Sequence, residues 1–291
     1  MKIKDIQLIF HKELDKIYGL EEVKSFFFLL IKSYYEITRL ALALDNNLSL
    51  TKSEQELIFS ALQDLKKEKP IQYILGETEF FALPFKVNES VLIPRPETEE
   101  LVSWVIEGVK SKIKNIDRPT HILDIGTGSG CIAISLAKNI PGAIVYALDV
   151  SQKALKIAKQ NSEMNRVDIK YIHLDILNSD TWNQSLIDLK FDVIVSNPPY
   201  VRKKEMQQMK ANVVQNEPHL ALFVDDDNPL LFYKKITEFG ANYLKAGGKL
   251  FFEINEFLGN ETVHLLEDNN FKNIELKQDI YNKDRCIKAV K

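Results

Sequence analysis

The feature that most limits the fold is an alternation of short apolar runs with helical patterns, which begins at His121 and continues through most of the remaining chain. This alternation is typical of a parallel sheet, because each crossover between parallel strands usually contains a helix. The sequence therefore predicts an α/β fold, with a mostly parallel sheet and helices on both of its faces. The predicted strands cover residues 121–125, 144–148, 169–173, 191–196 and 248–254.

The beginning of the chain has a different pattern, which predicts a small helical domain over residues 1–75. An apolar stripe at helical spacing lies within residues 23–34. Thr51, with Glu54 three residues later, predicts a capping box at the start of another helix, and Pro70 would end that helix. Such a domain is either a structural cap or a docking surface for a partner, and its pattern leaves both open.

A connector joins this helical domain to the α/β region. Residues 76–96 contain short aromatic runs separated by glycine and proline, which predicts a β-hairpin. Thr98 is a candidate cap for a helix over residues 98–110. The predicted domains are therefore a helical domain, a hairpin connector and an α/β domain over residues 97–291.

Composition limits the class of protein. With 45% hydrophobic residues the chain can bury a large core, and a net charge of −3 offers no basic surface for nucleic acid. Its two cysteines form no Cys-x-x-Cys pattern, so neither a disulfide framework nor a metal site is expected. The longest apolar block near the start is far shorter than the ~20 residues that cross a bilayer. We expect a cytoplasmic protein without a membrane partner.

A glycine-rich loop directly follows the strand predicted over residues 121–125. It consists of Gly126, Thr127, Gly128, Ser129 and Gly130. Glycine allows a tight turn and lets a ligand approach the backbone amides, so the loop is a candidate nucleotide-binding element. A nicotinamide or flavin cofactor is disfavoured, because Cys131 stands where the dinucleotide fingerprint requires its third glycine.

Acidic and aromatic residues after the next two strands extend this candidate cofactor site. Asp149 follows Gly126 by 23 residues, a spacing at which a carboxylate can accept hydrogen bonds from both hydroxyls of a ribose. The alternative is that Asp149 caps the following helix. Asp175 is a candidate for the adenine edge, and Trp182 is either a stacking contact or part of the core.

The strand predicted over residues 191–196 runs into a rigid polar turn. This turn consists of Asn197, Pro198, Pro199 and Tyr200. Each proline fixes its own φ and removes a backbone donor, so the Asn197 side chain and the neighbouring carbonyls are held in a defined arrangement. A planar amide or amine would fit there. Its two hydrogens can be accepted by the Asn197 oxygen and a proline carbonyl, and the ring of Tyr200 can pack against its flat face.

In combination, the glycine loop, Asp149 and this turn resemble the class I S-adenosylmethionine-dependent methyltransferases. Within that class, Asn-Pro-Pro-Tyr resembles the motif of enzymes that methylate planar amide or amine nitrogens. Other stretches resemble the PrmC/HemK family more narrowly. These are residues 70–76, 92–99, 217–222 and 284–285.

The resemblance implies methylation of the N5 nitrogen of the glutamine in the Gly-Gly-Gln motif of peptide chain release factors. It also implies S-adenosyl-L-methionine as methyl donor, a helical N-terminal domain that grips the release factor, and no metal. The residues that would carry catalysis are Asn197, Pro198 and Tyr200. Three local differences from the family pattern concern loop details: Asn255 and Asn282 stand where glycine is expected, and residues 213–215 lack an arginine.

Three other interpretations are open. An adenine-N6 nucleic-acid methyltransferase would share the tetrapeptide but needs a basic surface, and residues 202–204 are only a short basic run. A non-catalytic nucleotide-binding protein would not need the rigid Asn197 turn. An oxidoreductase is disfavoured by the glycine spacing.

Overall fold

The computed structural model describes residues 1–110, 118–182, 186, 189–279 and 281–291. The chain divides into two compact units. The first contains Met1–Gly76 and Lys210–Asn216, and the second contains Glu77–Met209 and Glu217–Lys291. The predicted division of the chain by function into three domains stays a prediction.

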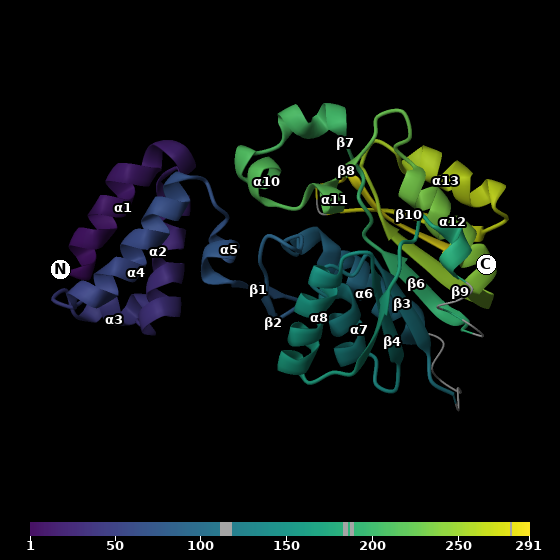
Figure 1. Ribbon diagram of the computed structural model, residues 1–291, viewed down its shortest axis with the longest axis horizontal. Helices are drawn as coiled ribbons and strands as arrows, with labels where there is room; N and C mark the ends of the chain where they lie inside the picture. Colours follow the sequence, from purple (N-terminus) through teal and green to yellow (C-terminus); the bar gives the residue numbers. More distant parts are fainter. Residues whose placement is uncertain (111–117, 183–185, 187–188, 280) are drawn as a thin grey trace. The chain divides into compact units, whose positions relative to one another are not determined.

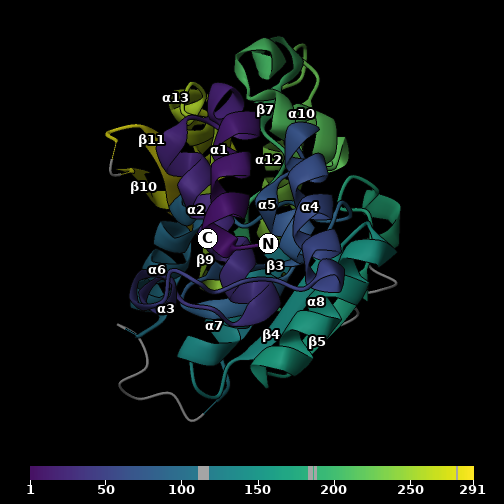
Figure 2. The ribbon, with the colours of Figure 1, turned by 90° about the vertical axis from the view of Figure 1, so that its left-hand side faces the viewer.

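The first unit is helical, as the sequence predicts. Its main helices are α1 (Ile3–Tyr18), α2 (Leu20–Tyr35), α3 (Arg39–Leu44), α4 (Lys52–Lys66) and α5 (Ile71–Leu75). Helices α1, α2 and α4 pack side by side around a core of buried aliphatic and phenylalanine side chains (Figure 2). The predicted capping box is confirmed, because Thr51 Oγ1 accepts from the Glu54 backbone N–H and the Thr51 N–H donates to Glu54 Oε2 at 2.7 Å.

A short helix from much later in the chain also belongs to the first unit. This helix is α10 (Ala211–Asn216). The Asn216 side-chain amide donates to the carbonyl oxygen of Glu68 at 3.3 Å. The chain therefore contributes to the first unit twice, which the sequence did not predict, and residues 213–215 lie in this second contribution.

The second unit contains a seven-stranded sheet with strand order β10-β11-β9-β6-β3-β4-β5. Each predicted strand is present, as β3 (His121–Ile125), β4 (Ile144–Asp149), β5 (Ile169–His173), β6 (Phe191–Ser196) and β9 (Leu244–Glu253). These strands pair in parallel, which confirms the predicted sheet. Two strands were missed, β10 (Lys272–Gln278) and β11 (Asp284–Val290), and they add an antiparallel edge next to β9.

Alternate residues of the sheet face two separate cores. Leu123, Leu148 and Phe252 point towards α12 (Leu231–Tyr243) and α13 (Gly259–Asp268). Ile122 and Phe251 point the other way, towards α6 (Pro96–Lys110), α7 (Cys131–Asn139) and α8 (Gln152–Asn165). Figure 1 shows these helices on the two sides of the sheet, so the prediction of helices on both faces is confirmed.

The connector and the helix after it agree with the prediction in part. The hairpin is confirmed, since β1 (Glu77–Phe80) and β2 (Leu83–Lys86) pair antiparallel, and it packs in the second unit. Helix α6, however, begins at Pro96, so Thr98 lies inside the first turn and does not cap it. Proline suits a first helical position, where the missing N–H would have no helical partner.

The remaining small elements are β7 (Val201–Arg202), which pairs in parallel with β8 (Phe223–Val224), the 3₁₀ helices Ser179–Thr181 and Lys203–Gln208, and α11 (His219–Leu222). Over the described ranges, no helix combines the length and the apolar character needed to cross a bilayer.

Candidate active site

Strand register brings the predicted site residues to one edge of the sheet. Ile125 of β3 pairs with Leu148 of β4 and with Ser196 of β6. Ser196 in turn pairs with Phe252 of β9. The residues that follow these four positions therefore form one row at the carboxyl ends of the parallel strands, where open α/β sheets bind ligands. Across the sheet, that row is Glu253, Asn197, Gly126 and Asp149.

The glycine loop joins β3 to α7, and its glycines have different surroundings. Gly128 has a φ of +55°, and among the described residues no heavy atom would lie within 4 Å of a Cβ added there. Gly130 has a φ of +83°, but a Cβ added there would meet Ile134 Cδ1 at 3.0 Å and Ala158 Cβ at 3.1 Å. Gly128 therefore leaves room beside the backbone, whereas Gly130 allows α7 and α8 to pack closely.

A buried carboxyl group, which the sequence analysis did not identify, forms hydrogen bonds to this loop and to the helix after it. Asp124 of β3 is fully buried, and its Oδ2 accepts hydrogen bonds from Thr127 Oγ1 at 2.7 Å and from the Ala133 N–H at 3.2 Å. Its Oδ1 has no hydrogen-bond partner within the described part of the chain. Burial raises the pKa of Asp124 to about 7. An acidic residue within the apolar run before the loop was the available signal.

Asp149 ends β4 and is tied to the glycine loop. Its Oδ2 accepts from the Gly128 N–H at 2.9 Å and its Oδ1 from the Ser151 N–H at 2.8 Å. Burial raises its pKa, while these backbone hydrogen bonds oppose that shift. The cap of α8 is Ser151, whose side chain accepts from the Ala154 N–H, so the helix-cap alternative for Asp149 is wrong. Each carboxylate oxygen keeps capacity for a further donor.

The two other predicted cofactor contacts lie in different surroundings. Asp175 is exposed, and its Oδ1 accepts from the Leu177 N–H at 2.9 Å. Trp182 is buried in the core, where its indole N–H donates to the Ile176 carbonyl and its ring meets the edge of Phe239 at a centroid distance of 5.1 Å. These contacts show how Trp182 packs, and its role as a cofactor contact stays a prediction.

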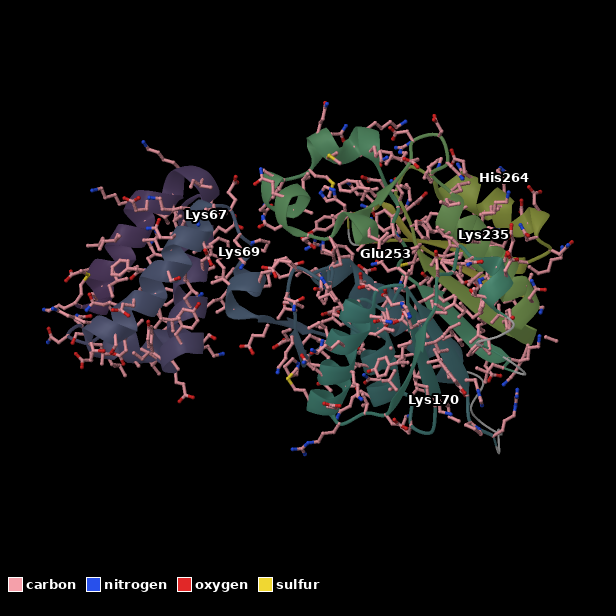
Figure 3. All side chains as sticks on the ribbon, in the orientation of Figure 1. Lys67, Lys69, Lys170, Lys235, Glu253 and His264 are labelled. Atoms are coloured by element: carbon pink, nitrogen blue, oxygen red, sulfur yellow. The ribbon has the colours of Figure 1, made fainter. Side chains whose placement is uncertain are left out.

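The Asn197 turn follows β6 and is held by a chain of side-chain hydrogen bonds. Asn197 Nδ2 donates to Thr98 Oγ1 at 3.2 Å, and the Thr98 hydroxyl donates to Glu253 Oε2 at 2.6 Å. The Tyr200 hydroxyl donates to Glu253 Oε1 at 2.9 Å. Figure 3 labels Glu253, which ends β9. Pro198 is buried, while Pro199 and Tyr200 are half-buried beside it.

Glu253 is therefore the organising side chain of this region, although the sequence analysis did not identify it. It is 1% exposed. Burial raises its pKa, and the hydrogen bonds from Thr98 and Tyr200 oppose that shift. Burial and the Glu253 charge also raise the pKa of Tyr200 well above its usual value, which keeps that hydroxyl protonated as a donor. A charged residue at the end of the apolar run of β9 was the available signal.

Asn255 stands where the family pattern suggests glycine, and here its side chain is fully used. Its Nδ2 donates to the Tyr200 carbonyl oxygen and to Glu205 Oε2, each at 3.0 Å. Its Oδ1 accepts from the Phe257 N–H at 2.9 Å. These hydrogen bonds connect the chain after Tyr200 to the loop after β9. Asparagine in place of the expected glycine is therefore stabilised by its own side-chain contacts.

A partly buried ion pair joins two of the stretches that carry the family resemblance. Arg95 donates to Glu217 Oε1 at 2.6 Å, and the Ile93 N–H donates to Glu217 Oε2 at 3.2 Å. The Glu217 side chain is only 1% exposed. In the described ranges, no cluster of three or more His, Cys, Asp or Glu side chains has an arrangement that could hold a metal ion.

Known proteins with similar sequences decide the family. The model of the Methyltransferase small domain family matches residues 108–221, and that of the PrmC N-terminal domain matches residues 19–76. A release factor glutamine methyltransferase of Flavobacterium psychrophilum is 52% identical over 99% of both chains. One of Bacteroides thetaiotaomicron is 41% identical over 96% of both chains. The chain belongs to the release factor glutamine methyltransferase family. The PrmC/HemK resemblance is confirmed.

A solved methyltransferase structure agrees with the fold of this family member. It is a T. thermophilus 16S rRNA N2 G1207 methyltransferase in complex with AdoMet and guanosine, with a TM-score of 0.51 and 20% identity. The match covers 74% of this chain and 49% of that chain. At this identity it supports the fold alone, which is the class I methyltransferase fold predicted from the sequence.

Proposed function

We propose that this methyltransferase transfers a methyl group from S-adenosyl-L-methionine to the side-chain N5 nitrogen of the glutamine in the Gly-Gly-Gln motif of peptide chain release factors. The observation that carries the proposal is the fixed amide of Asn197 at the carboxyl edge of the sheet, in a chain of this family. Residues 1–75 would contact the release factor. The enzyme would act in the cytoplasm, without a membrane and without direct contact to nucleic acid.

The residues at the sheet edge fit this methyl donor. The open space beside Gly128 would accept a ligand against the backbone, and Asp149 keeps acceptor capacity for ribose hydroxyls. When bound, S-adenosyl-L-methionine supplies an electrophilic methyl group on a sulfonium. The residues proposed to hold it are Gly126, Thr127, Gly128, Ser129, Gly130, Asp149, Trp182 and Asn197. Thr127 and Ser129 are buried, so their part would fall mainly to the backbone.

The Asn197 turn would bind and orient the substrate amide. A primary amide is a weak nucleophile because its nitrogen lone pair is delocalised, so positioning and stabilisation of the developing positive charge matter most. Asn197 Oδ1 would accept one amide hydrogen and a carbonyl beside Pro198 or Pro199 the other, while the ring of Tyr200 packs on the flat face. The net reaction would form one N–C bond as the bond between the methyl group and the sulfonium sulfur breaks, leave S-adenosyl-L-homocysteine, and release one amide proton to water.

Labelled S-adenosyl-L-methionine tests the proposal directly. Three acceptors are compared: a purified release factor, the same factor with the glutamine of its Gly-Gly-Gln motif replaced, and duplex DNA. Label on the intact factor alone is the expected result. Label on DNA would support the adenine-N6 alternative, and cofactor binding without label on any acceptor would support a binding protein.

A further inference from the structure

Four polar side chains form a continuous hydrogen-bond chain, which we call the Glu253 network: Asn197, Thr98, Glu253 and Tyr200. They come from the turn after β6, from α6 and from β9, and Thr98 and Glu253 are 155 residues apart in the sequence. Thr98 and Glu253 are 2% and 1% exposed, so the network is largely closed to water.

The chemistry of each group gives the network a single direction. The hydrogen bonds with the hydroxyls of Thr98 and Tyr200 favour the carboxylate form of Glu253 and oppose the effect of its burial. A carboxylate only accepts hydrogen bonds, so in this form both hydroxyls donate to Glu253. Thr98 has one hydroxyl proton, which it donates in the hydrogen bond to Glu253. Towards any other partner, the Thr98 oxygen can therefore only accept a hydrogen bond. Its other partner must therefore be a donor, and the only donor in the Asn197 side chain is Nδ2.

We propose that Thr98 and Glu253 are positioning residues that fix the side-chain amide of Asn197, so that its Oδ1 faces the substrate amide. The proposal rests on the proposed function for the identity of that substrate. With Nδ2 held on Thr98, Oδ1 lies on the other branch of the planar amide and is available as an acceptor.

The opposite orientation of the amide is disfavoured by the same groups. If Oδ1 and Nδ2 of the Asn197 amide exchanged places, Oδ1 would lie next to Thr98 Oγ1. Two acceptors would then face each other without a proton between them. Thr98 could supply that proton only by leaving Glu253, and a buried carboxylate that loses a donor is strongly disfavoured. A substrate amide would then also meet the Nδ2 donor in place of an acceptor, so the wrong orientation opposes binding of the reacting nitrogen.

Substitution of Thr98 tests this inference with little change in shape. Thr98→Val keeps the volume but removes the hydroxyl, whereas Thr98→Ser keeps the hydroxyl. Thr262→Val is the matched control, because Thr262 is also fully buried and donates to the Leu258 carbonyl at 2.7 Å, but lies in α13. We expect Thr98→Val to lower kcat on the order of ten- to a hundredfold, with KM for the methyl donor within about twofold of wild type. Thr98→Ser and Thr262→Val should stay close to wild type.

A spectroscopic measurement tests the orientation of the Asn197 side-chain amide without any methyl acceptor present. In protein labelled with ¹⁵N at asparagine, the signal of the Asn197 side-chain amide is the one that Asn197→Ala removes. In wild type one of its two protons should exchange slowly with water, since it is bonded to Thr98. In Thr98→Val both should exchange fast, and Thr98→Ser should restore the slow proton.

Two results would overturn the inference: equal kcat in wild type and Thr98→Val, or amide exchange that the valine leaves unchanged. These results are separate from failure of the proposed function. If the wild type methylates no release factor, that function is wrong, while the exchange measurement still decides whether Thr98 holds the Asn197 amide.

Discussion

Replacing Gly130 with alanine should destabilise the second unit much more than the same replacement at Gly128. The two glycines lie two residues apart in one loop, and both have positive φ, at +83° and +55°. They differ in what a methyl group would meet. At Gly130 it would lie 3.1 Å from Ala158 Cβ and 3.3 Å from Ala158 Cα, whereas at Gly128 it would enter open space among the described residues.

The magnitudes follow from these surroundings. Holding alanine at positive φ costs roughly 1–2 kcal/mol at either position. At Gly130 the extra methyl also has to displace α8, because the Ala158 backbone cannot turn aside as the Ile134 side chain can, and overpacking of this kind costs typically ~1–3 kcal/mol. We therefore expect Gly130→Ala to lose about 2–5 kcal/mol in free energy of unfolding, a large share of the ~5–15 kcal/mol of an ordinary domain.

Urea unfolding monitored by tryptophan fluorescence measures this loss of stability in the second unit of the chain. The chain has two tryptophans, Trp104 and Trp182, and both belong to the second unit. Calorimetry with S-adenosyl-L-methionine adds the second measurement. Gly128→Ala should keep most of the stability yet bind the methyl donor more weakly, because its methyl group occupies space proposed for the ligand. Equal stability losses in the two variants, or a larger loss at Gly128, would refute this reasoning.

Three further predictions concern the polar residues of the site. Asn197→Ala should lose much more of the methyl transfer than of the binding of the methyl donor. Asp149→Ala should instead weaken that binding by about tenfold or more. Calorimetry and turnover separate the two effects, and the reverse pattern would exchange their assigned roles. Burial raises the pKa of Asp124 from 3.8 to about 7. Between these two values the folded state keeps a proton that the unfolded state releases. The contribution of Asp124 to stability is therefore present at low pH and is lost as the pH rises to about 7. Asp124→Asn should remove that decline, so urea midpoints of variant and wild type that run parallel across this range would contradict the raised pKa. Asn255→Gly removes the hydrogen bonds to Tyr200 and Glu205 and should cost about 1–3 kcal/mol, and an unchanged urea midpoint would count against their contribution.

Most of the parallel strands were predictable because β3, β4, β6 and the end of β9 are largely buried on both faces and therefore appear as runs of apolar residues. Strand β10 has no such run, since most of its residues are exposed. Its partner β11 has only a short apolar stretch around Ile287. Both strands form through pairing with β9 and with each other, which is a long-range contact without a local pattern.

The roles of Thr98 and Glu253 were not predictable in the same way. A threonine near the start of a helix favours a cap, and that preference was outweighed by a hydrogen bond to a carboxylate on a distant strand. The sequence left Trp182 open between a stacking contact and core packing, and its contact with Phe239, which lies far along the chain, had no local signal.

The amino-acid sequence alone was enough for the parallel strands of the sheet, the glycine loop and the rigid turn at Asn197, because apolar periodicity, glycine and proline act through the local backbone. Only the tertiary structure decided which groups meet at the sheet edge. Strand register placed Glu253, Asn197, Gly126 and Asp149 in one row, and the direction of the hydrogen bonds in the Glu253 network depends on that placement. A hydrogen bond needs its donor and acceptor about 3 Å apart, and only the folded chain brings such distant residues together.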